Sequence, residues 1–475
     1  MKTNKTQAVC DWVLEKIHWQ IYLPGQRIPS VRALAEKLSV STFTVAQAYD
    51  RLTAHGHLTA VRGSGYYVNK NSGNNHNKRY RHSEHHADHR TNPNTPPLAS
   101  LNDNTLETGW LLGHLFNDYP DSHSPGSGQL PTAWVTQDFL QTAIRRTTAC
   151  LNDFTYRYNH VQGYQPLRET FSRQLDDLGI RAKPEHMVTT SGVSGAIELL
   201  LNYFVRAGDA VIVDDPGWFW IIGCLQQKGI RVFGVTRNHD GPDIEQLEKL
   251  LIHEKPKLYI TNSVLHNPTS FNIHPAVAYQ VLNLMREHDV YLLEDDIYGH
   301  LSVGSPALRY AALDQFDRVF YAGGPSKIIG GNWRVGLLCC PESHIEGVMR
   351  QKLLSNMATP ELTERGVYQL WTDSYYRKHV ASVQNKLLKA HEQLRPKLNA
   401  IGIAYPEHAQ AGLMLWIDTG KKDTVTMALD AHKAGWLIAP GHLFSPRKNT
   451  STHMRLNVAM CSDDFLVWLD SYNAT

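Results

Sequence analysis

From about Thr155 onward, short runs of apolar residues alternate with longer amphipathic stretches such as PAVAYQVLNLMREHD, at 275–289. The apolar runs are MVTT (187–190), AVIVDD (210–215), LYIT (258–261), VYLLED (290–295), RVFYAG (318–323) and GLLCC (336–340). Continuous apolar strands that alternate with helices are typical of a mainly parallel sheet with helices on both faces. The pattern therefore predicts an α/β body whose ligands bind beyond the carboxyl ends of the strands.

The charge is distributed unevenly between the start of the chain and the rest. The 47 basic and 45 acidic residues give a net charge of +2. The first 90 residues, however, hold 13 basic and 6 acidic residues, and the rest of the chain holds 34 and 39. A basic head on an acidic body indicates that only the head contacts nucleic acid.

Residues 69–100 have almost no aliphatic side chains and end in a proline-rich stretch, which predicts a linker. Five histidines lie in it, and a His-rich tract can bind metal, although a solvated tether explains the composition equally well. We therefore expect a head at 1–69, a linker at 70–100 and a body at 101–475. No metal site is predicted in the head or the body.

Composition excludes several classes of protein. With 42% hydrophobic and 19% charged residues, the chain holds enough apolar material for a large core, so global disorder is excluded. No apolar run approaches the roughly 18 to 20 residues that a membrane span needs. The polar start argues against a secretory signal, and six scattered cysteines without a CxxC pair indicate reduced thiols. We expect a cytoplasmic protein with no membrane contact.

The head shows the pattern of a winged helix-turn-helix. Residues 6–21 are predicted to form a helix, Ser30 to cap a helix at 31–38, and Ser41 to cap another that runs to about His55. Two helices joined by so short a turn form a helix-turn-helix, whose second helix can enter the major groove. HLTAVRGSGYYV then predicts two short strands around a Gly-rich turn, which form a wing.

This stretch resembles the DNA-binding domain of GntR-family transcription regulators. The resemblance rests on the PG-x-R-x-PS-x-R element, the VS-x-x-TV helix start, Y-x-x-L and the G-x-G wing, which occur in order. It implies that Arg32 contacts DNA, and Thr42, where the family often has Arg, shifts recognition toward Arg32 and Gln47. The residues implied to lie close to the DNA backbone are Ser30, Ser41, Thr44, Arg62 and Gly63.

In the body, TTSGVSGAIELLLNYF (189–204) predicts a strand that runs through a Gly-bearing turn into a helix. Backbone N–H groups at Gly192, Val193 and Ser194 would then point outward at the positive end of the helix dipole, with the Ser194 hydroxyl as another donor. The turn is either a phosphate-binding site or a simple helix cap.

Further polar and aromatic residues follow the other predicted strands. They are Trp218, Asn267, Asp295, Tyr298, Ser326, Lys327 and Arg334. Pyridoxal 5′-phosphate needs these residue types: a lysine for a Schiff base, a carboxylate for the ring nitrogen, donors to the ring oxygen and a phosphate cradle.

Residues 100–475 resemble fold-type I pyridoxal-phosphate enzymes, the aspartate aminotransferase class, with a smaller C-terminal α+β domain at about 345–475. The resemblance implies that Lys327 forms the Schiff base, that Asp295 pairs with the ring nitrogen, and that Asn267 and Tyr298 bind the ring oxygen. It also implies that Trp218 stacks on the ring. The phosphate would be held by Gly192, Val193, Ser194, Ser326 and Arg334.

The same resemblance assigns two residues to other partners. Tyr158 matches the tyrosine that reaches the phosphate of the neighbouring subunit, and Arg455 matches the arginine that binds a substrate carboxylate. One position departs from the family pattern: Gly324 stands three before Lys327, where the family usually has a phosphate-binding Ser.

A GntR-type head joined to an aminotransferase-like body resembles the MocR-type transcription regulators. The resemblance implies a homodimer that binds operator DNA. Its body would sense pyridoxal phosphate, or an amino-acid-like or amine effector, through an aldimine. The alternative is a working pyridoxal-phosphate-dependent aminotransferase with an accessory DNA-binding head, because Lys327, Asp295 and Arg455 are all present.

Overall fold

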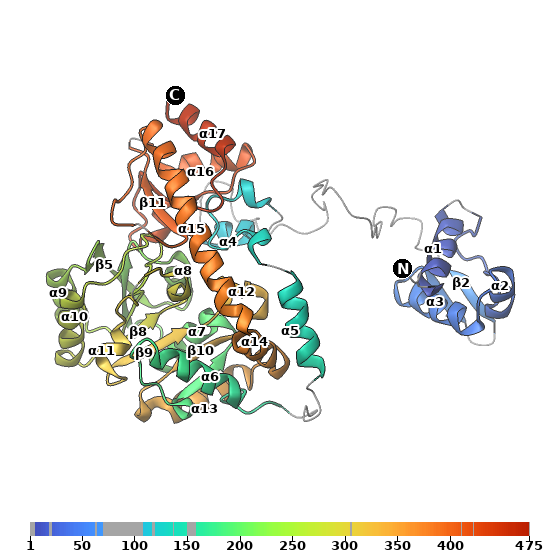
Figure 1. The fold of residues 1–475 in the computed structure, drawn as a ribbon, viewed down its shortest axis with the longest axis horizontal. Coiled ribbons are helices and arrows are strands. Elements are labelled where there is room, and N and C mark those ends of the chain that lie inside the picture. Colours follow the sequence, from blue (N-terminus) through green and yellow to red (C-terminus); the bar gives the residue numbers. More distant parts are fainter. Residues whose placement is uncertain are drawn as a thin grey trace. The chain divides into compact units, whose positions relative to one another are not determined.

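The computed structural model describes residues 5–18, 21–61, 64–69, 108–115, 119–135, 137–149, 158–304, 306–409, 411–420 and 422–474. The chain forms two compact units, residues 1–90 and 91–475 (Figure 1). The predicted linker at 70–100 lies outside the described residues.

The head contains three helices and a two-stranded wing. Its helices are α1 (Lys5–His18), α2 (Val31–Lys37) and α3 (Thr42–Ala54), and its strands β1 (Leu58–Val61) and β2 (Gly65–Val68) pair antiparallel. Ser30 Oγ accepts a hydrogen bond from the N–H of Ala33, and Ser41 Oγ accepts one from the N–H of Thr44. Each side chain satisfies a backbone donor that the first turn leaves free, so both predicted helix starts are confirmed.

The three helices of the head pack around a small apolar core. Leu34 of α2 and Val45 of α3 are fully buried, as is Val13 of α1. Tyr49 is also buried, and its hydroxyl donates to the carbonyl oxygen of Pro29 at 2.8 Å, which ties α3 to the segment that leads into α2. This packing fixes which face of α3 points outward.

The body is built on an eight-stranded sheet in the order β3-β10-β9-β8-β7-β4-β5-β6. The strands are β3 (Met187–Thr190), β4 (Ala210–Asp215), β5 (Arg231–Asn238), β6 (Gly241–Pro242), β7 (Leu258–Thr261), β8 (Tyr291–Asp295), β9 (Val319–Gly323) and β10 (Gly336–Cys339). The adjacent strands β5, β4, β7, β8 and β9 pair parallel to one another. The strand β10 is antiparallel to both β3 and β9, and β6 is antiparallel to β5. The predicted mainly parallel sheet is confirmed.

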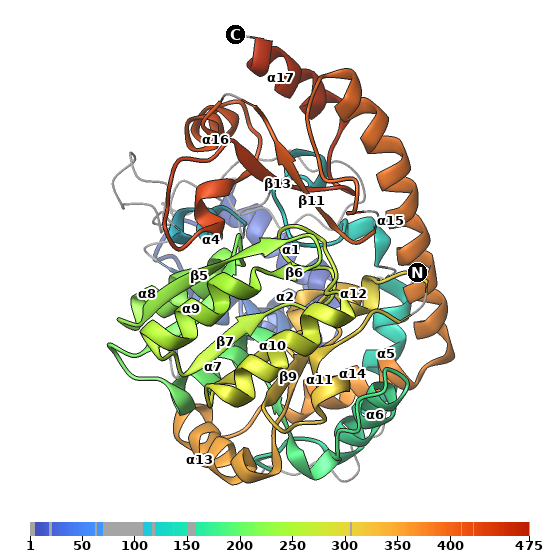
Figure 2. The ribbon, with the colours of Figure 1, turned by 90° about the vertical axis from the view of Figure 1, so that its left-hand side faces the viewer.

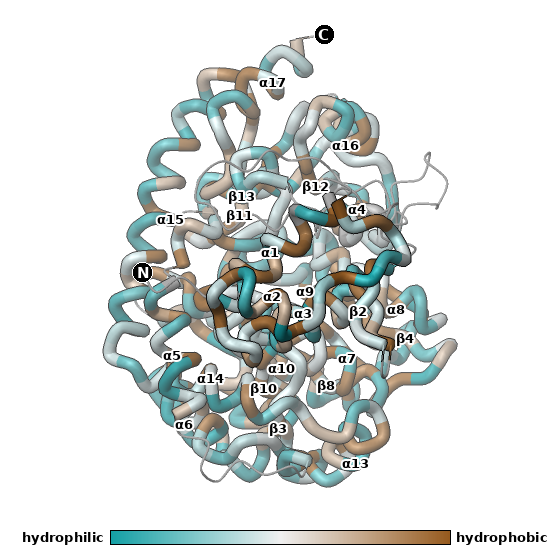
Figure 3. Tube along the Cα trace, turned by 90° about the vertical axis from the view of Figure 1, so that its right-hand side faces the viewer, coloured by the Kyte–Doolittle hydropathy of each residue, from teal (hydrophilic) through white to brown (hydrophobic). Residues whose placement is uncertain are grey.

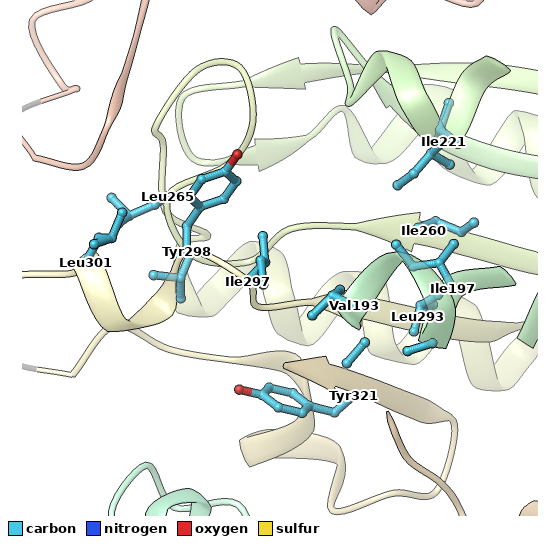
Figure 4. Packing of buried hydrophobic residues seen from close by; sticks show 14 of the residues in the cluster. Val193, Ile197, Ile221, Ile260, Leu265, Leu293, Ile297, Tyr298, Leu301 and Tyr321 are labelled. Carbon is cyan, nitrogen blue, oxygen red and sulfur yellow. The ribbon is translucent and has the colours of Figure 1, made fainter. Parts of the chain in front are cut away.

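Helices cover this sheet on both faces. One group consists of α9 (Ile244–Glu254), α10 (Pro275–Glu287) and α11 (Tyr310–Asp314). In this group α10 lies between the other two helices and packs against both (Figure 2). The helix α7 (Gly192–Phe204) contacts β3, β9 and β10. Figure 4 shows apolar side chains such as Ile197, Ile260 and Leu293 packed between α7 and the strands. The large core rigidly positions the strand ends.

Four further helices belong to the part of the body that contains the eight-stranded sheet. They are α5 (Gln137–Ala149), α6 (Gln165–Asp176), α13 (Ile345–Asn356) and α14 (Glu361–Thr372). The helix α13 packs on α7, and α14 packs on α5 and α6. The short helices α4 (Thr108–Leu115) and α8 (Phe219–Gln227) contact each other.

A smaller antiparallel sheet follows the long helix α15 (Ser374–Ala400), which runs along the edge of the body (Figure 2). Its strands lie in the order β11-β13-β12, with β11 at Met414–Asp418, β12 at Ala439–Pro440 and β13 at His453–Asn457. The helices α16 (Thr424–Lys433) and α17 (Asp463–Ala474) complete this part. The predicted C-terminal α+β region is confirmed.

The surface of α15 is mostly hydrophilic, as Figure 3 shows, while Val383 and Leu387 on its other face are fully buried. Such amphipathicity is typical of a helix that covers a protein core. Within the described ranges, no helix is both long enough and apolar enough to cross a bilayer.

Candidate functional site

The carboxyl ends of neighbouring strands carry the polar residues that the sequence pattern singled out. Asp295 is the last residue of β8, and Lys327 lies in the short helix α12 (Ser326–Ile329), four residues after β9. Asn267 follows β7, and Trp218 follows β4. Because parallel strands end at the same edge of a sheet, these side chains meet although they are far apart in sequence.

Lys327 lies at the centre of the site. Its Nζ donates to the carbonyl oxygen of Gly128 at 2.7 Å and lies 5.3 Å from the centre of the Tyr298 ring. Desolvation, with the positive charge of Arg455 as the next cause, lowers the pKa of the Lys327 ammonium to about 8. A substantial fraction is therefore the neutral amine near physiological pH, and only this form is a nucleophile.

Asp295 is a buried carboxylate without a cationic partner in direct contact. Its Oδ1 accepts a hydrogen bond from the N–H of Ile297 at 3.1 Å. Burial raises the pKa of the carboxyl to about 7 from its ordinary 3.8, against the lowering effect of hydrogen bonds from Ile297 and Asn262. An ionised carboxylate held in so poorly solvated a place would gain much from a cationic ligand group.

Arg455 lies on β13 of the small antiparallel sheet and is 2% exposed. Its guanidinium contacts residues outside that sheet. Its Nη1 donates to Asn267 Oδ1 at 3.0 Å, and its Nη2 donates to the carbonyl oxygen of Gly126 at 2.6 Å. Its Nε is buried without a hydrogen-bond partner. Burial lowers the pKa of Arg455 to about 10. A buried guanidinium with an unused donor is suited to bind an anion such as a carboxylate.

The segment Gly126–Gly128 lies among Lys327, Tyr298 and Arg455. Its carbonyl groups accept from Lys327 and Arg455, and a Cβ at Gly128 would lie 3.6 Å from the Tyr298 hydroxyl. A Cβ at Gly126 would lie 2.5 Å from the backbone of Ile438 and Ala439, so only glycine fits there. The role of this segment was not predicted from the sequence.

The amino-terminal end of α7 forms a cradle with Arg334. Arg334 Nη2 donates to the carbonyl oxygen of Ser191 at 2.6 Å and to Ser194 Oγ at 2.8 Å. A Cβ at Gly192 would lie 3.0 Å from the Arg334 guanidinium, and a Cβ at Gly336 would lie 2.4 Å from the Gly192 backbone. A guanidinium beside a helix amino terminus, with close approach permitted by glycines, is suited to a phosphate group.

Gly324 is the position at which the family pattern has serine. A Cβ there would lie 3.0 Å from the carbonyl oxygen of Val335, which is tighter than an ordinary contact. The close passage of the segment before β10 therefore favours glycine. Ser326, two residues later, starts α12 and is partly exposed.

Trp218 lines a small cleft together with Asn262, His266 and Asp295. Its ring stacks on Trp220, with ring centres 5.0 Å apart. The cleft thus lies between an aromatic side chain and the buried carboxylate at the end of β8.

A buried charged cluster that was not predicted from the sequence contributes Asp214 and His266 to the lining of the cleft. Asp214 Oδ2 lies 3.1 Å from His266 Nε2 and 3.4 Å from Arg237 Nη1, and all three residues are buried. Tyr259 also donates to Asp214, at 2.5 Å. Arg237 and the hydrogen bonds lower the pKa of Asp214, although burial alone would raise it. The DD at the end of the AVIVDD run was the only sequence signal for this cluster.

Tyr158 does not join this site within its own chain. It is 81% exposed. Its neighbour Asn159 donates to Glu364 Oε2 at 2.9 Å, and buried Lys352 donates to the carbonyl oxygen of Val161 at 2.6 Å. The loop is therefore held firmly while the Tyr158 ring points into solvent.

In the head, Arg32 on α2 is exposed, and Ser30, Ser41 and Thr44 lie at helix starts. Gln47 is exposed on α3, but its Oε1 accepts a hydrogen bond from Thr6 Oγ1 at 3.3 Å, so its amide oxygen is engaged with α1. Arg62 and Gly63 lie outside the described residues.

Comparison with known families assigns both parts of the chain. Residues 126–466 match the family aminotransferase class I and II, and residues 5–68 match bacterial regulatory proteins, gntR family.

Two relatives align with nearly the whole chain, across both parts. One is the uncharacterized HTH-type transcriptional regulator YdcR of Escherichia coli strain K12, which is 25% identical and is aligned over 96% of this chain and 95% of its own. Another is the HTH-type transcriptional regulator NorG of Staphylococcus aureus strain USA300, which is 24% identical over 92% of this chain and 96% of its own.

Solved structures show the same fold for the body. A kynurenine aminotransferase of Pyrococcus horikoshii superposes with a TM-score of 0.69 at 23% identity, covering 77% of this chain and 92% of that one. An archaeal alanine:glyoxylate aminotransferase gives a TM-score of 0.69 at 20% identity, covering 74% and 90%.

Proposed function

Since the chain belongs to the aminotransferase class I and II family and carries a gntR-type head, we propose that its body binds pyridoxal 5′-phosphate and thereby controls DNA binding by the head. The architecture is that of a helix-turn-helix transcription regulator with an aminotransferase-like domain. The observation that carries the proposal is the convergence of Lys327, Asp295 and Arg455 at one edge of the sheet.

The residues of the site fit this cofactor. The unpaired carboxylate of Asp295 suits a pyridinium nitrogen, and its pKa of about 7 would fall beside a cationic ring. Trp218 offers an aromatic wall, and Arg334 with the start of α7 offers a phosphate cradle. The set therefore supplies a partner for each polar end of the molecule and for its flat face.

When bound, the cofactor supplies an electrophilic carbonyl carbon and an electron-withdrawing ring. Lys327 would hold it covalently, and its lowered pKa of about 8 provides the neutral amine that this needs. Asn267 and Tyr298 would hold the ring oxygen, and Arg455 would orient a carboxylate of an amino-acid-like effector. Gly128, whose carbonyl oxygen accepts from Lys327 in this structure, would then lose that contact.

Regulation requires that the ligand bind two conformations of the protein with different affinity. The carbonyl groups of Gly126 and Gly128 could link ligand binding to such a change in conformation. A ligand that binds Lys327 and Arg455 competes with these carbonyl groups for both cations. The segment follows α4, which lies nearer the head in sequence. Ligand occupancy would thus alter the contacts of this segment with Lys327 and Arg455.

We also propose a homodimer. The exposed ring of Tyr158, on a loop anchored by Asn159, supports this proposal, since it would reach the phosphate site of a second subunit. Two subunits also supply two heads, which suits an operator with two half-sites. Sedimentation of the purified chain tests this, since a monomer at micromolar concentration contradicts it.

Absorbance tests cofactor binding, and a salt-controlled gel shift tests DNA binding. The purified chain should be yellow with pyridoxal phosphate, and Lys327→Ala should lose the visible band. It should bind a fragment from upstream of its own gene or another genomic fragment, more tightly at low salt. A colourless wild-type protein refutes the first part, and failure to bind any fragment refutes the second.

Transamination is a second candidate activity. It is favoured by the lowered pKa of Lys327, since the same amine could move a proton at the substrate carbon. Incubation with an amino acid and a keto acid, followed by detection of the exchanged pair, tests it. A regulator without activity gives no exchange with any pair while still changing its absorbance.

A further inference from the structure

The helix α3 of the head carries an aromatic side chain that the fold does not use. Phe43 is 70% exposed, more than the other large apolar side chains exposed in the described part of the head, Ile21, Leu23 and Val61. Burying a phenylalanine is worth roughly 1.5–3 kcal/mol, so leaving it in water forgoes a substantial gain. A partner that covers the ring would recover that gain.

The packing of α3 fixes the direction of Phe43. Val45, Ala48, Tyr49 and Leu52 are buried at i, i+3, i+4 and i+7, which defines a single inward stripe. Phe43 lies off this stripe and is exposed. The ring therefore projects from the first turn of the helix, away from the core of the head.

The surroundings of Phe43 suit a polyanion. The first turn of α3 contains no acidic residue, and Ser41 and Thr44 place their hydroxyl groups at the same helix end, 2.8 Å apart. Residues 1–69, which form the head, contain eight basic and four acidic side chains. A basic head that exposes an apolar ring indicates that the ring contacts an apolar group of a nucleic acid.

In the DNA major groove, that apolar feature is the C5-methyl group of thymine. It is the one apolar group that base edges present there, and phenylalanine is among the side chains that contact it. First-turn residues of the second helix of a helix-turn-helix reach base edges. Gln47, one turn later, already accepts a hydrogen bond from Thr6 through its Oε1.

We propose that Phe43 is a specificity-determining residue that recognises thymine in the operator through its methyl group. This inference rests on the proposed DNA-binding function. It adds a preference for A·T pairs at the positions that face the first turn of α3, set by apolar contact and not by a hydrogen bond.

Replacing thymine by uracil tests the proposal, because uracil lacks only the methyl group and pairs in the same way. A bound upstream fragment is prepared with dTTP or with dUTP, and the full chain is titrated at one salt concentration. The wild type should bind the thymine fragment about fourfold more tightly for each methyl group contacted, the factor expected for one buried carbon. In Phe43→Ala the two fragments should bind equally.

Two further variants make the comparison specific. Phe43→Leu keeps an apolar side chain and should retain part of the thymine preference. Leu23→Ala removes another exposed apolar side chain of the head and should keep the full wild-type ratio. The melting temperature of Phe43→Ala should equal that of the wild type, since the ring contributes little to the core.

The inference fails if the wild type binds both fragments equally, or if Phe43→Ala keeps the wild-type ratio. Either result leaves the proposed function intact, because the thymine fragment is still bound. If the wild type binds no fragment of either kind, the proposed function and the inference fail together.

Discussion

Two adjacent carboxylates, Asp295 and Asp296, should respond in opposite directions to the same substitution. Asp295 has no cationic partner in contact, and burial raises its pKa to about 7. Asp296 accepts from Arg309 Nε at 2.8 Å, and both side chains of this pair are 3% exposed. Changing each residue to asparagine preserves shape and removes one charge.

The effect of Asp295→Asn follows from linkage. The folded protein binds the Asp295 proton more tightly than the unfolded chain, whose pKa is near 3.8, so ionisation destabilises the fold as pH rises from about 4 to 7. The gap between the two pKa values corresponds to about 4 kcal/mol above pH 7. Asparagine does not ionise, so the cofactor-free variant should be more stable than the wild type by up to this amount at pH 8 and equal to it at pH 4.

Asp296→Asn should have the opposite effect. It leaves the Arg309 guanidinium buried without its counter-charge, which costs about 3–5 kcal/mol. Urea unfolding of the cofactor-free proteins, followed by tryptophan fluorescence at pH 4 and pH 8, measures both changes. If Asp295→Asn lowers the unfolding free energy at pH 8, the Asp295 carboxylate is not an uncompensated charge and the reasoning about the site is refuted.

Three other substitutions test the phosphate cradle, the carboxylate-binding arginine and the close packing of one glycine. Arg334→Ala should weaken pyridoxal phosphate binding by about 10-fold to 100-fold in an absorbance titration, because the phosphate loses a charged donor, whereas Arg231→Ala, an exposed arginine on β5, should not. Arg455→Met should abolish the absorbance response to amino acids while retaining that to amines without a carboxylate, and equal loss of both would contradict its role. Gly163→Ala places a Cβ 1.9 Å from Thr189 Oγ1 and should destabilise the fold by about 3 kcal/mol. Gly179→Ala, with a similar positive φ but open space, should cost only about 1 kcal/mol, and equal costs would remove the clash as the cause.

The sequence predicted the sheet and the edge where the polar residues gather. The apolar runs that became β4, β7, β8 and β9 each end at a residue of the site or shortly before one. The order of the strands in the sheet was not predicted. The antiparallel direction of β10 could not be predicted, because four apolar residues carry no signal of direction.

Contacts between distant segments account for most of what sequence reasoning missed. The carbonyl group of Gly128 meets Lys327 across 199 positions of the chain, and the stretch before it lacks any periodic pattern. Nothing in the sequence marked His266 and Arg237 as partners of Asp214, because only the folded sheet brings the three residues together. The hydrogen bond between Thr6 and Gln47 likewise joins residues far apart in the sequence, and it engages an amide oxygen that would otherwise be free to bind a partner.

If the proposed function is right, ligand bound at Lys327 changes DNA binding by the head. One measurement tests it most directly: the affinity of the full chain for its upstream fragment, with and without pyridoxal phosphate, for the wild type and Lys327→Ala. The wild-type affinity should shift by about 5-fold or more, the lower end of typical coupling between two sites, and the affinity of the variant should not shift. Equal wild-type affinities with and without the cofactor, in a protein that visibly binds it, would contradict the claim.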